Sequence, residues 1–144
     1  MTTSIIEEPE YMSSATLIVL GTRLQPREVS TLLRMRPSQA WARGDAKRHR
    51  GTRVGDSVHE WGGWKKVLPP SQRDRPLPQQ LLHWLRLLKH KADAFSSLRD
   101  LDCRCVLNCY VGTSATATIT LSAELQMAMS ELGLDLELDV FVTP

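Results

Sequence analysis

Apolar and polar positions alternate along this chain in a way that marks strands near both ends. The run from Ala15 to Leu20 is apolar, rich in β-forming residues and ends at Gly21, which is typical of a buried strand. From Leu134 to Val142, leucine and valine alternate with mostly acidic residues, so one face of that strand is apolar and the other polar. A shorter strand is predicted from Gly63 to Leu68, before a pair of prolines.

A further alternation runs from Asp102 to Val111, where three cysteines share the apolar face. The turn signal Gly112-Thr113-Ser114 follows, and threonines then alternate with apolar residues from 116 to 121. The pattern predicts a β-hairpin that joins strands 102–111 and 116–121.

Helical spacing appears in three segments. Pro26 opens a short helix that ends before Pro37. The longest segment begins near Pro78 and is predicted as a single helix, since its apolar residues recur at spacings of 4, 3, 4 and 3. A third helix begins after Ser122, a good N-cap, and ends at Gly133. The apolar stripe of the longest helix consists of Leu81, Leu85, Leu88, Ala92 and Phe95.

The predicted fold class is α+β: a mostly antiparallel sheet with helices packed on one face and ferredoxin-like elements in the second half. A length of 144 residues suits a single domain, which we place at residues 14–144. Residues 1–13 are expected to form a flexible tail, because they carry acids and none of the basic residues of a secretory signal.

Residues 37 to 60 show no sustained period and are predicted as a long loop with at most one irregular strand. Long loops in compact domains are usually functional or disordered. Three of the four tryptophans lie on or beside this loop, at Trp41, Trp61 and Trp64. We interpret Trp41 and Trp64 mainly as structural, since indole rings often bury beneath loops. For Trp61, a structural role and a binding role both stay open.

The net charge of +2 conceals a segregation of charge along the chain. Between Arg34 and Arg53, seven lysines and arginines stand against one acid. From Asp100 onward, seven acids stand against one base. Such asymmetry bears on partners and steering rather than on fold.

These patterns give two candidate partner-binding surfaces. The loop surface has the tryptophans and the basic run, and the sheet surface has the polar faces of two strands. Candidates on the loop are Trp41, Asp45, Arg48, Arg50, Arg53, Trp61 and Trp64. Candidates on the sheet are Arg104, Tyr110, Asp135, Glu137 and Asp139.

The sequence contains no phosphate-binding loop, dinucleotide fingerprint or nucleophile elbow. Cys103, Cys105 and Cys109 are expected as small buried residues, because their spacing suits neither a disulfide nor a zinc site. We therefore predict no catalytic residue, no cofactor and no metal. One acid–base cluster stays open in the loop, formed by Asp45, Asp56, His59 and Glu60.

The setting of the protein follows from its cysteines and its hydropathy. Three clustered cysteines suit a reducing cytoplasm. No apolar run approaches the roughly 20 residues that a membrane span needs. We expect a cytoplasmic monomer or homodimer with no membrane partner.

A set of short motifs, weak singly and moderately specific together, links the chain to a known family. In chain order they are Ala15-Thr16-Leu17, Gly21, Pro26 with Glu28, Pro37, Trp41-Ala42-Arg43-Gly44-Asp45, Trp64, Lys91-Ala92-Asp93-Ala94, Leu121-Ser122 and Leu132-Gly133-Leu134-Asp135-Leu136. In this order the chain resembles the bacterial family called domain of unknown function 4279, from about Ser14 to Val142. The resemblance implies a compact α+β domain and no established activity. The chain departs from the family pattern between Arg48 and Gly62, where its loop is longer and more basic than the pattern leads one to expect.

Three functional hypotheses remain open. The leading one is a non-enzymatic binding protein, immunity-like because members of the family it resembles are often small stand-alone bacterial proteins. An alternative is a nucleic-acid-binding protein that uses the basic loop 43–53. A third is a small-ligand or enzymatic site under the 41–64 loop.

Overall fold

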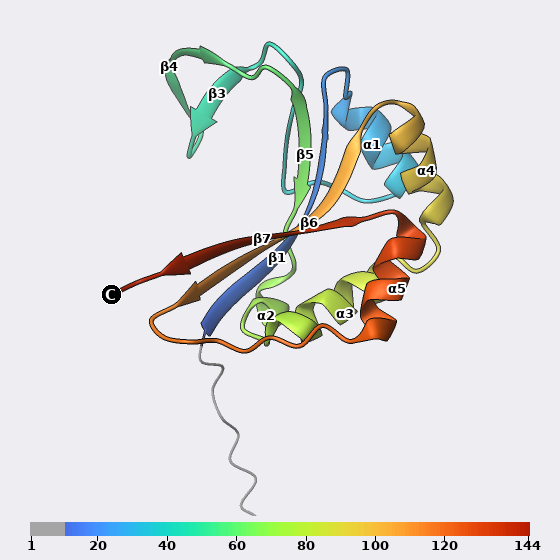
Figure 1. The fold of residues 1–144 in the computed structure, drawn as a ribbon. Helices are drawn as coiled ribbons and strands as arrows, with labels where there is room; N and C mark the ends of the chain where they lie inside the picture. The colour runs from blue at the N-terminus through green and yellow to red at the C-terminus, as the bar shows by residue number, and fades with distance from the viewer. Residues whose placement is uncertain (1–10) are drawn as a thin grey trace, which may run out of the picture.

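A five-stranded sheet in the spatial order β2-β5-β1-β6-β7 forms the centre of the computed structural model, which describes residues 11–144 (Figure 1). Neighbouring strands are antiparallel except β6 and β7, which run parallel. The predicted α+β class and mostly antiparallel sheet are therefore confirmed. The strands are β1 (Tyr11–Gly21), β2 (Gln39–Trp41), β5 (Gly62–Lys66), β6 (Arg104–Thr113) and β7 (Asp135–Val142).

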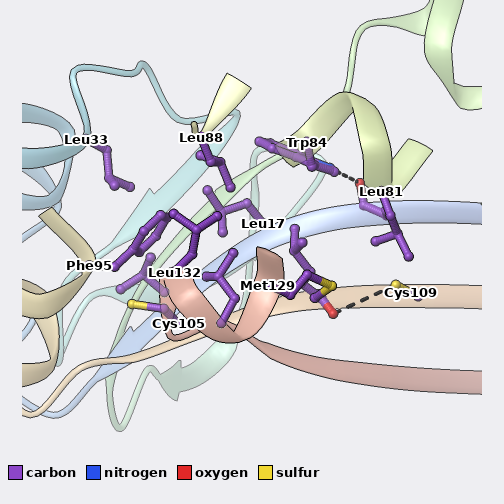
Figure 2. Packing of buried hydrophobic residues seen from close by; sticks show 14 of the residues in the cluster. Leu17, Leu33, Leu81, Trp84, Leu88, Phe95, Cys105, Cys109, Met129 and Leu132 are labelled. Carbon is purple, nitrogen blue, oxygen red and sulfur yellow. Dashed lines mark hydrogen bonds between the residues drawn. The ribbon is translucent and has the colours of Figure 1, made fainter. Parts of the chain in front are cut away.

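The helices pack on one face of this sheet (Figure 1). They are α1 (Pro26–Leu33), α2 (Pro70–Arg73), α3 (Leu77–Leu87), α4 (Ala92–Asp100) and α5 (Ala123–Leu132). Alternate residues of β1 point toward them, and Figure 2 shows Leu17 among side chains from α3, α4 and α5. The core also contains a buried amide, Gln80, which binds the backbone of Ser13 and Ala15. This side chain ties α3 to the first half of β1.

The segment predicted as one long helix is two helices, so that prediction is wrong. α3 ends at Leu87 and is capped by Leu88, whose N–H donates to the carbonyl of Trp84. α4 begins at Ala92, after a turn and the N-cap residue Lys91. The apolar spacing continues across the break because both helices bury side chains in the same core, Leu88 on one side of the turn and Phe95 on the other. The helical spacing of the apolar residues therefore could not reveal the turn between α3 and α4.

The predicted hairpin of strands 102–111 and 116–121 is also wrong. β6 pairs with β1 on one side and β7 on the other, which leaves no free edge for a third partner. Residues 114–122 instead follow an extended path outside any strand, along the lower rim of the sheet to α5 (Figure 1). Ile119 and Leu121 pack against the core, so the alternation reflects burial of one side of this path.

The region predicted as a loop, 37–60, holds three strands. β2 adds to the sheet beside β5. β3 (Ala46–His49) and β4 (Thr52–Val58) pair only with each other among the described strands, as a separate two-stranded hairpin. This hairpin, residues 46–58, stands away from the body (Figure 1) and is called the arm below.

The start of the domain differs from the expected boundary. Tyr11 is already in β1, opposite Thr113 of β6, so residues 11–13 belong to the sheet. The rest of the expected tail, residues 1–10, lies outside the described residues.

Candidate partner-binding surfaces

The tip of the arm is a two-residue turn between His49 and Thr52, which face each other across the hairpin. Arg50 and Gly51 occupy it with φ values of 50° and 81°. Positive φ at both positions is the type I′ geometry of tight hairpins, for which Asn-Gly is the favoured sequence. An arginine therefore holds a left-handed position that asparagine or glycine would occupy with less strain.

The arm is strongly basic and fully solvated. Every residue of β4 is exposed, and so is every residue of β3 except Ala46. Four lysines and arginines stand against one acid, Asp56. Arg48 and Arg53 donate to carbonyls of the arm itself, at 3.1 Å each, and within residues 11–144 no ion pair reaches the arm. Most of its positive charge is therefore uncompensated.

Trp41 anchors the base of the arm to the sheet. Its indole N–H donates to the carbonyl of Trp61 at 3.0 Å, and its ring stacks on His59 with centroids 4.6 Å apart. The ring lies directly over Gly63, where a Cβ would come within 2.2 Å of it. Only glycine at that position lets Trp41 take this place.

Asp45 also serves the base of the arm. Its carboxylate accepts a hydrogen bond from the N–H of Ala42 at 2.9 Å, across a turn that contains Gly44 at φ 90°. The backbones of residues 44–45 and His59 exchange two further hydrogen bonds. The base is thus closed by backbone pairing before the arm begins.

A concavity of about 660 Å³ opens between the arm and β2. Trp41, Asp45, Arg48 and Arg50 line it together with His59. Of the acid–base cluster considered from the sequence, only Asp45 and His59 reach this concavity, and both have structural partners.

The remaining candidates of the loop separate from one another. Trp61 is 59% exposed beside the arm, on the surface. Trp64 is fully buried, and its indole N–H donates to Ser30 at 3.0 Å. Trp64 therefore belongs to the core and does not touch a partner directly. Arg53 is exposed on β4, outside the concavity.

On the sheet face that no helix covers, the expected polar side chains come together. Arg104 forms ion pairs with Asp135 at 3.1 Å and with Glu137 at 3.4 Å. The hydrogen bond that Arg104 donates to the Asp135 carboxylate raises the pKa of Arg104 above its ordinary value. Asn108, which was not among the candidates, donates to Glu137 and Asp139 at 3.0 Å each. Parallel pairing of β6 with β7 produces this ladder, because it places Glu137 beside Asn108 and Asp139 beside Tyr110. Asp135 pairs with Val106, and its carboxylate reaches Arg104, two residues earlier on the same face of β6.

An aromatic pair ends the same face. Tyr110 and Phe141 have ring centroids 5.2 Å apart, and both side chains are exposed. Tyr110 leans over Gly112, the next residue of β6 on this face. Neither the Tyr110–Phe141 contact nor the stacking of His59 on Trp41 could be found from the sequence, since both depend on which strands become neighbours.

None of the three cysteine thiols is exposed at the surface as a nucleophile. All three are free and buried, as the alternation predicted. Burial raises the pKa of Cys105 and of Cys109 to about 12, so both are neutral thiols near pH 7. Within residues 11–144, no three side chains of the metal-ligating types gather into a possible site.

A family model described as "Domain of unknown function (DUF4279)" matches residues 9–143, nearly the whole chain. The chain belongs to this family. The DUF4279 match confirms the resemblance inferred from the motifs. No curated protein and no solved structure matches the chain significantly. Among residues 11–144, no helix combines the length and apolar character required to cross a membrane. The DUF4279 description names no activity.

Proposed function

We propose that this DUF4279 protein is a non-catalytic binding protein, immunity-like in that it recognises and neutralises a partner protein. The arm is its main contact element, and the partner presents an acidic surface to it. The observation that carries the proposal is the arm itself: a hairpin with uncompensated positive charge that stands clear of the sheet.

The isolation of the arm supports a binding role. Two-stranded hairpins are marginally stable alone in water, so an arm of this kind adds little to the stability of the fold. The arm nevertheless keeps Arg50 at the strained tip position. A strained residue at an exposed tip is typical of sites where the side chain serves recognition.

The side chains around the arm suit a protein interface. Arginine and tryptophan are enriched in interface cores and in binding hot spots. The arm presents Arg48, Arg50 and Arg53, and the exposed ring of Trp61 lies beside its base. Uncompensated charge of one sign speeds association with a partner of opposite sign.

Site-specific photo-crosslinking tests the proposal in cells that express the native partner. A photoreactive residue at Thr52 labels what touches the arm tip, and one at Gln126 on α5 serves as a matched exposed control. We expect one protein to be captured from Thr52 and not from Gln126. Loss of that product in Arg50→Asn supports the role of the arginine, because asparagine suits the type I′ turn and preserves the hairpin.

A charge-matched pair of variants completes the design. Arg48→Glu with Arg53→Glu reverses two charges on the arm, and Arg86→Glu with Lys89→Glu makes the same change on and just after α3. We expect only the first pair to abolish capture. Equal capture by both pairs, or no protein product from Thr52, would overturn the proposal.

A nucleic-acid partner is the second candidate, and the shape of the arm favours it. The major groove of B-DNA, about 12 Å wide, admits a two-stranded β-ribbon. Titration with duplex and single-stranded oligonucleotides decides between the candidates. Nucleic-acid binding predicts an affinity that falls with salt, with a slope smaller by about 0.9 for each phosphate contact that Arg48→Gln or Arg53→Gln removes. Weak binding without a salt slope excludes this candidate.

A further inference from the structure

The edge of the sheet opposite the arm has backbone groups without a neighbouring strand. β7 ends the sheet among the described residues. The N–H of Thr143 donates to the carbonyl of Thr113 in β6, at 2.9 Å. Successive residues of a parallel strand direct their backbone groups to opposite sides. The N–H and C=O groups of Leu138 and Val140 therefore point outward, away from β6.

This edge also presents an uncovered apolar row. Leu138, Val140 and Val142 are 51%, 57% and 72% exposed. With the extended path 114–122, they line a groove of about 300 Å³ on the helix side of the sheet, also lined by Ile119 and Leu121. Native proteins usually shorten, charge or cover their edge strands, because a long apolar edge pairs readily with another chain. The apolar side chains of Leu138, Val140 and Val142 are typical of a strand that has a neighbouring strand on both sides.

The other face of β7 is acidic. Asp135, Glu137 and Asp139 form a row along it. Arg104 and Asn108 bind these carboxylates from the β6 side only. The outer side of the row is open to a strand that carries positive charge, since opposite charges on directly paired strands stabilise a sheet.

The same row disfavours a second copy of β7 as the occupant. Residues directly opposite each other in an antiparallel pair lie on the same face. In a symmetric pair centred on Leu138, Glu137 would oppose Asp139 of the other copy. A pair centred on Asp139 would place that residue against itself. Like charges in direct opposition destabilise a sheet. A symmetric pair centred on Val140 avoids this opposition, but it sets Asp139 against Phe141 and gives the acidic row no cationic partner. A basic strand of a different protein complements the row better than a second copy does.

We propose that β7 accepts an extended segment of a partner protein, added as a sixth strand of the sheet. Its apolar side chains enter the groove beside Val140, and its alternating basic side chains lie against the acidic row. Strand addition obtains affinity from main-chain hydrogen bonds and specificity from alternate side chains. The site lies at the sheet edge opposite the β2–β5 side that bears the arm, and it does not depend on the function proposed for the arm.

A synthetic peptide tests the proposal directly. The probe is a fluorescein-labelled peptide that alternates lysine with valine over a length matching the eight residues of β7. Its control has the same composition, with all lysines before all valines. We expect the alternating peptide to bind at least about tenfold more tightly in fluorescence anisotropy, since only it separates the two kinds of side chain onto two faces.

Hydrogen exchange gives a readout that charge attraction alone does not change. The amides of Leu138 and Val140 should become protected when the alternating peptide binds, because strand addition gives them acceptors. Val140→Pro removes an outward N–H at an edge position where proline is tolerated. We expect it to retain the fold and to lose at least about tenfold in peptide affinity.

A second pair of variants keeps the test decisive if the proline variant does not fold. Glu137→Gln with Asp139→Asn retains the shape of the acidic row and removes its charge at these two positions, and Glu124→Gln with Glu131→Gln makes the same charge change on α5. We expect about fivefold weaker peptide binding in the first pair and no change in the second. The arm variants should leave peptide binding unchanged, so this proposal and that for the arm fail separately.

Three results would overturn the proposal. One is equal binding of the alternating and the blocked peptide. Another is no binding of the alternating peptide up to about 1 mM, which corresponds to roughly 4 kcal/mol of binding free energy. The third is protection of the Leu138 and Val140 amides without peptide, together with a dimer in sedimentation, which would assign the edge to a second copy.

Discussion

Gly63→Ala should displace Trp41 and loosen the base of the arm while the core stays intact. A Cβ at position 63 would lie 2.2 Å from the Trp41 ring, far inside van der Waals contact. The ring must leave its place, and it then loses its hydrogen bond to Trp61 and its stacking on His59. An exposed hydrogen bond and an aromatic pair are each worth about 1 kcal/mol, so the expected destabilisation is about 2 kcal/mol.

Gly112→Ala is the matched control on the same sheet face. Its Cβ would meet the Tyr110 hydroxyl at 3.0 Å, the far end of a side chain that can rotate away. We expect a change within about 0.5 kcal/mol for this variant. Thermal unfolding should then lower the Tm of Gly63→Ala by about 7 °C relative to the control. The NMR signals of the His59 ring should also lose the ring-current shift from Trp41. Equal Tm values for the two variants, or an unchanged His59 signal in Gly63→Ala, would refute this account of the arm base.

Two further predictions concern the arm and the thiols. Replacement of residues 46–58 by Asn-Gly should shift Tm by less than about 3 °C, because hydrogen bonds between residues 44–45 and His59 already close the base of the arm. A loss of cooperative unfolding in this variant would contradict the prediction. Since the pKa values of Cys105 and Cys109 are about 12 in the folded protein, stability should fall as pH rises from about 9 to 12: the unfolded thiols release protons that the folded ones retain. The Cys105→Ala, Cys109→Ala double variant should show a shallower decline in urea unfolding over that range, and an identical slope would refute the assignment.

Strands could be predicted from the sequence where one face of the strand is buried and the other face is exposed. The alternation along 102–111 and 134–142 matched strands β6 and β7, and it also assigned Arg104 and the acids to the uncovered face. The same rule failed at 116–121, where an extended path buries Ile119 and Leu121 without belonging to a sheet. One-sided burial produces alternation whether or not a strand has partners.

The arm could not be predicted by periodicity because almost all its side chains on both faces are exposed. A hairpin without a buried face has no apolar period, and the turn signal Arg50-Gly51 departs from the usual Asn-Gly. The contact of Trp41 with Gly63 was hidden for another reason. It depends on β2 lying beside β5, and strand order follows from the whole chain rather than from either segment.

The central position of β1 also affects how the chain is synthesised. β1 ends at Gly21, whereas its longest partner, β6, begins at Arg104, 83 residues later (104 minus 21). At ribosomal rates of about 5–20 residues per second, the apolar stretch of β1 waits roughly 4–17 s before that partner is made. During this interval the apolar side chains of β1 are accessible to chaperones and to other nascent chains. The yield of native protein in a cell therefore depends on how well these side chains are shielded until β6 has been synthesised.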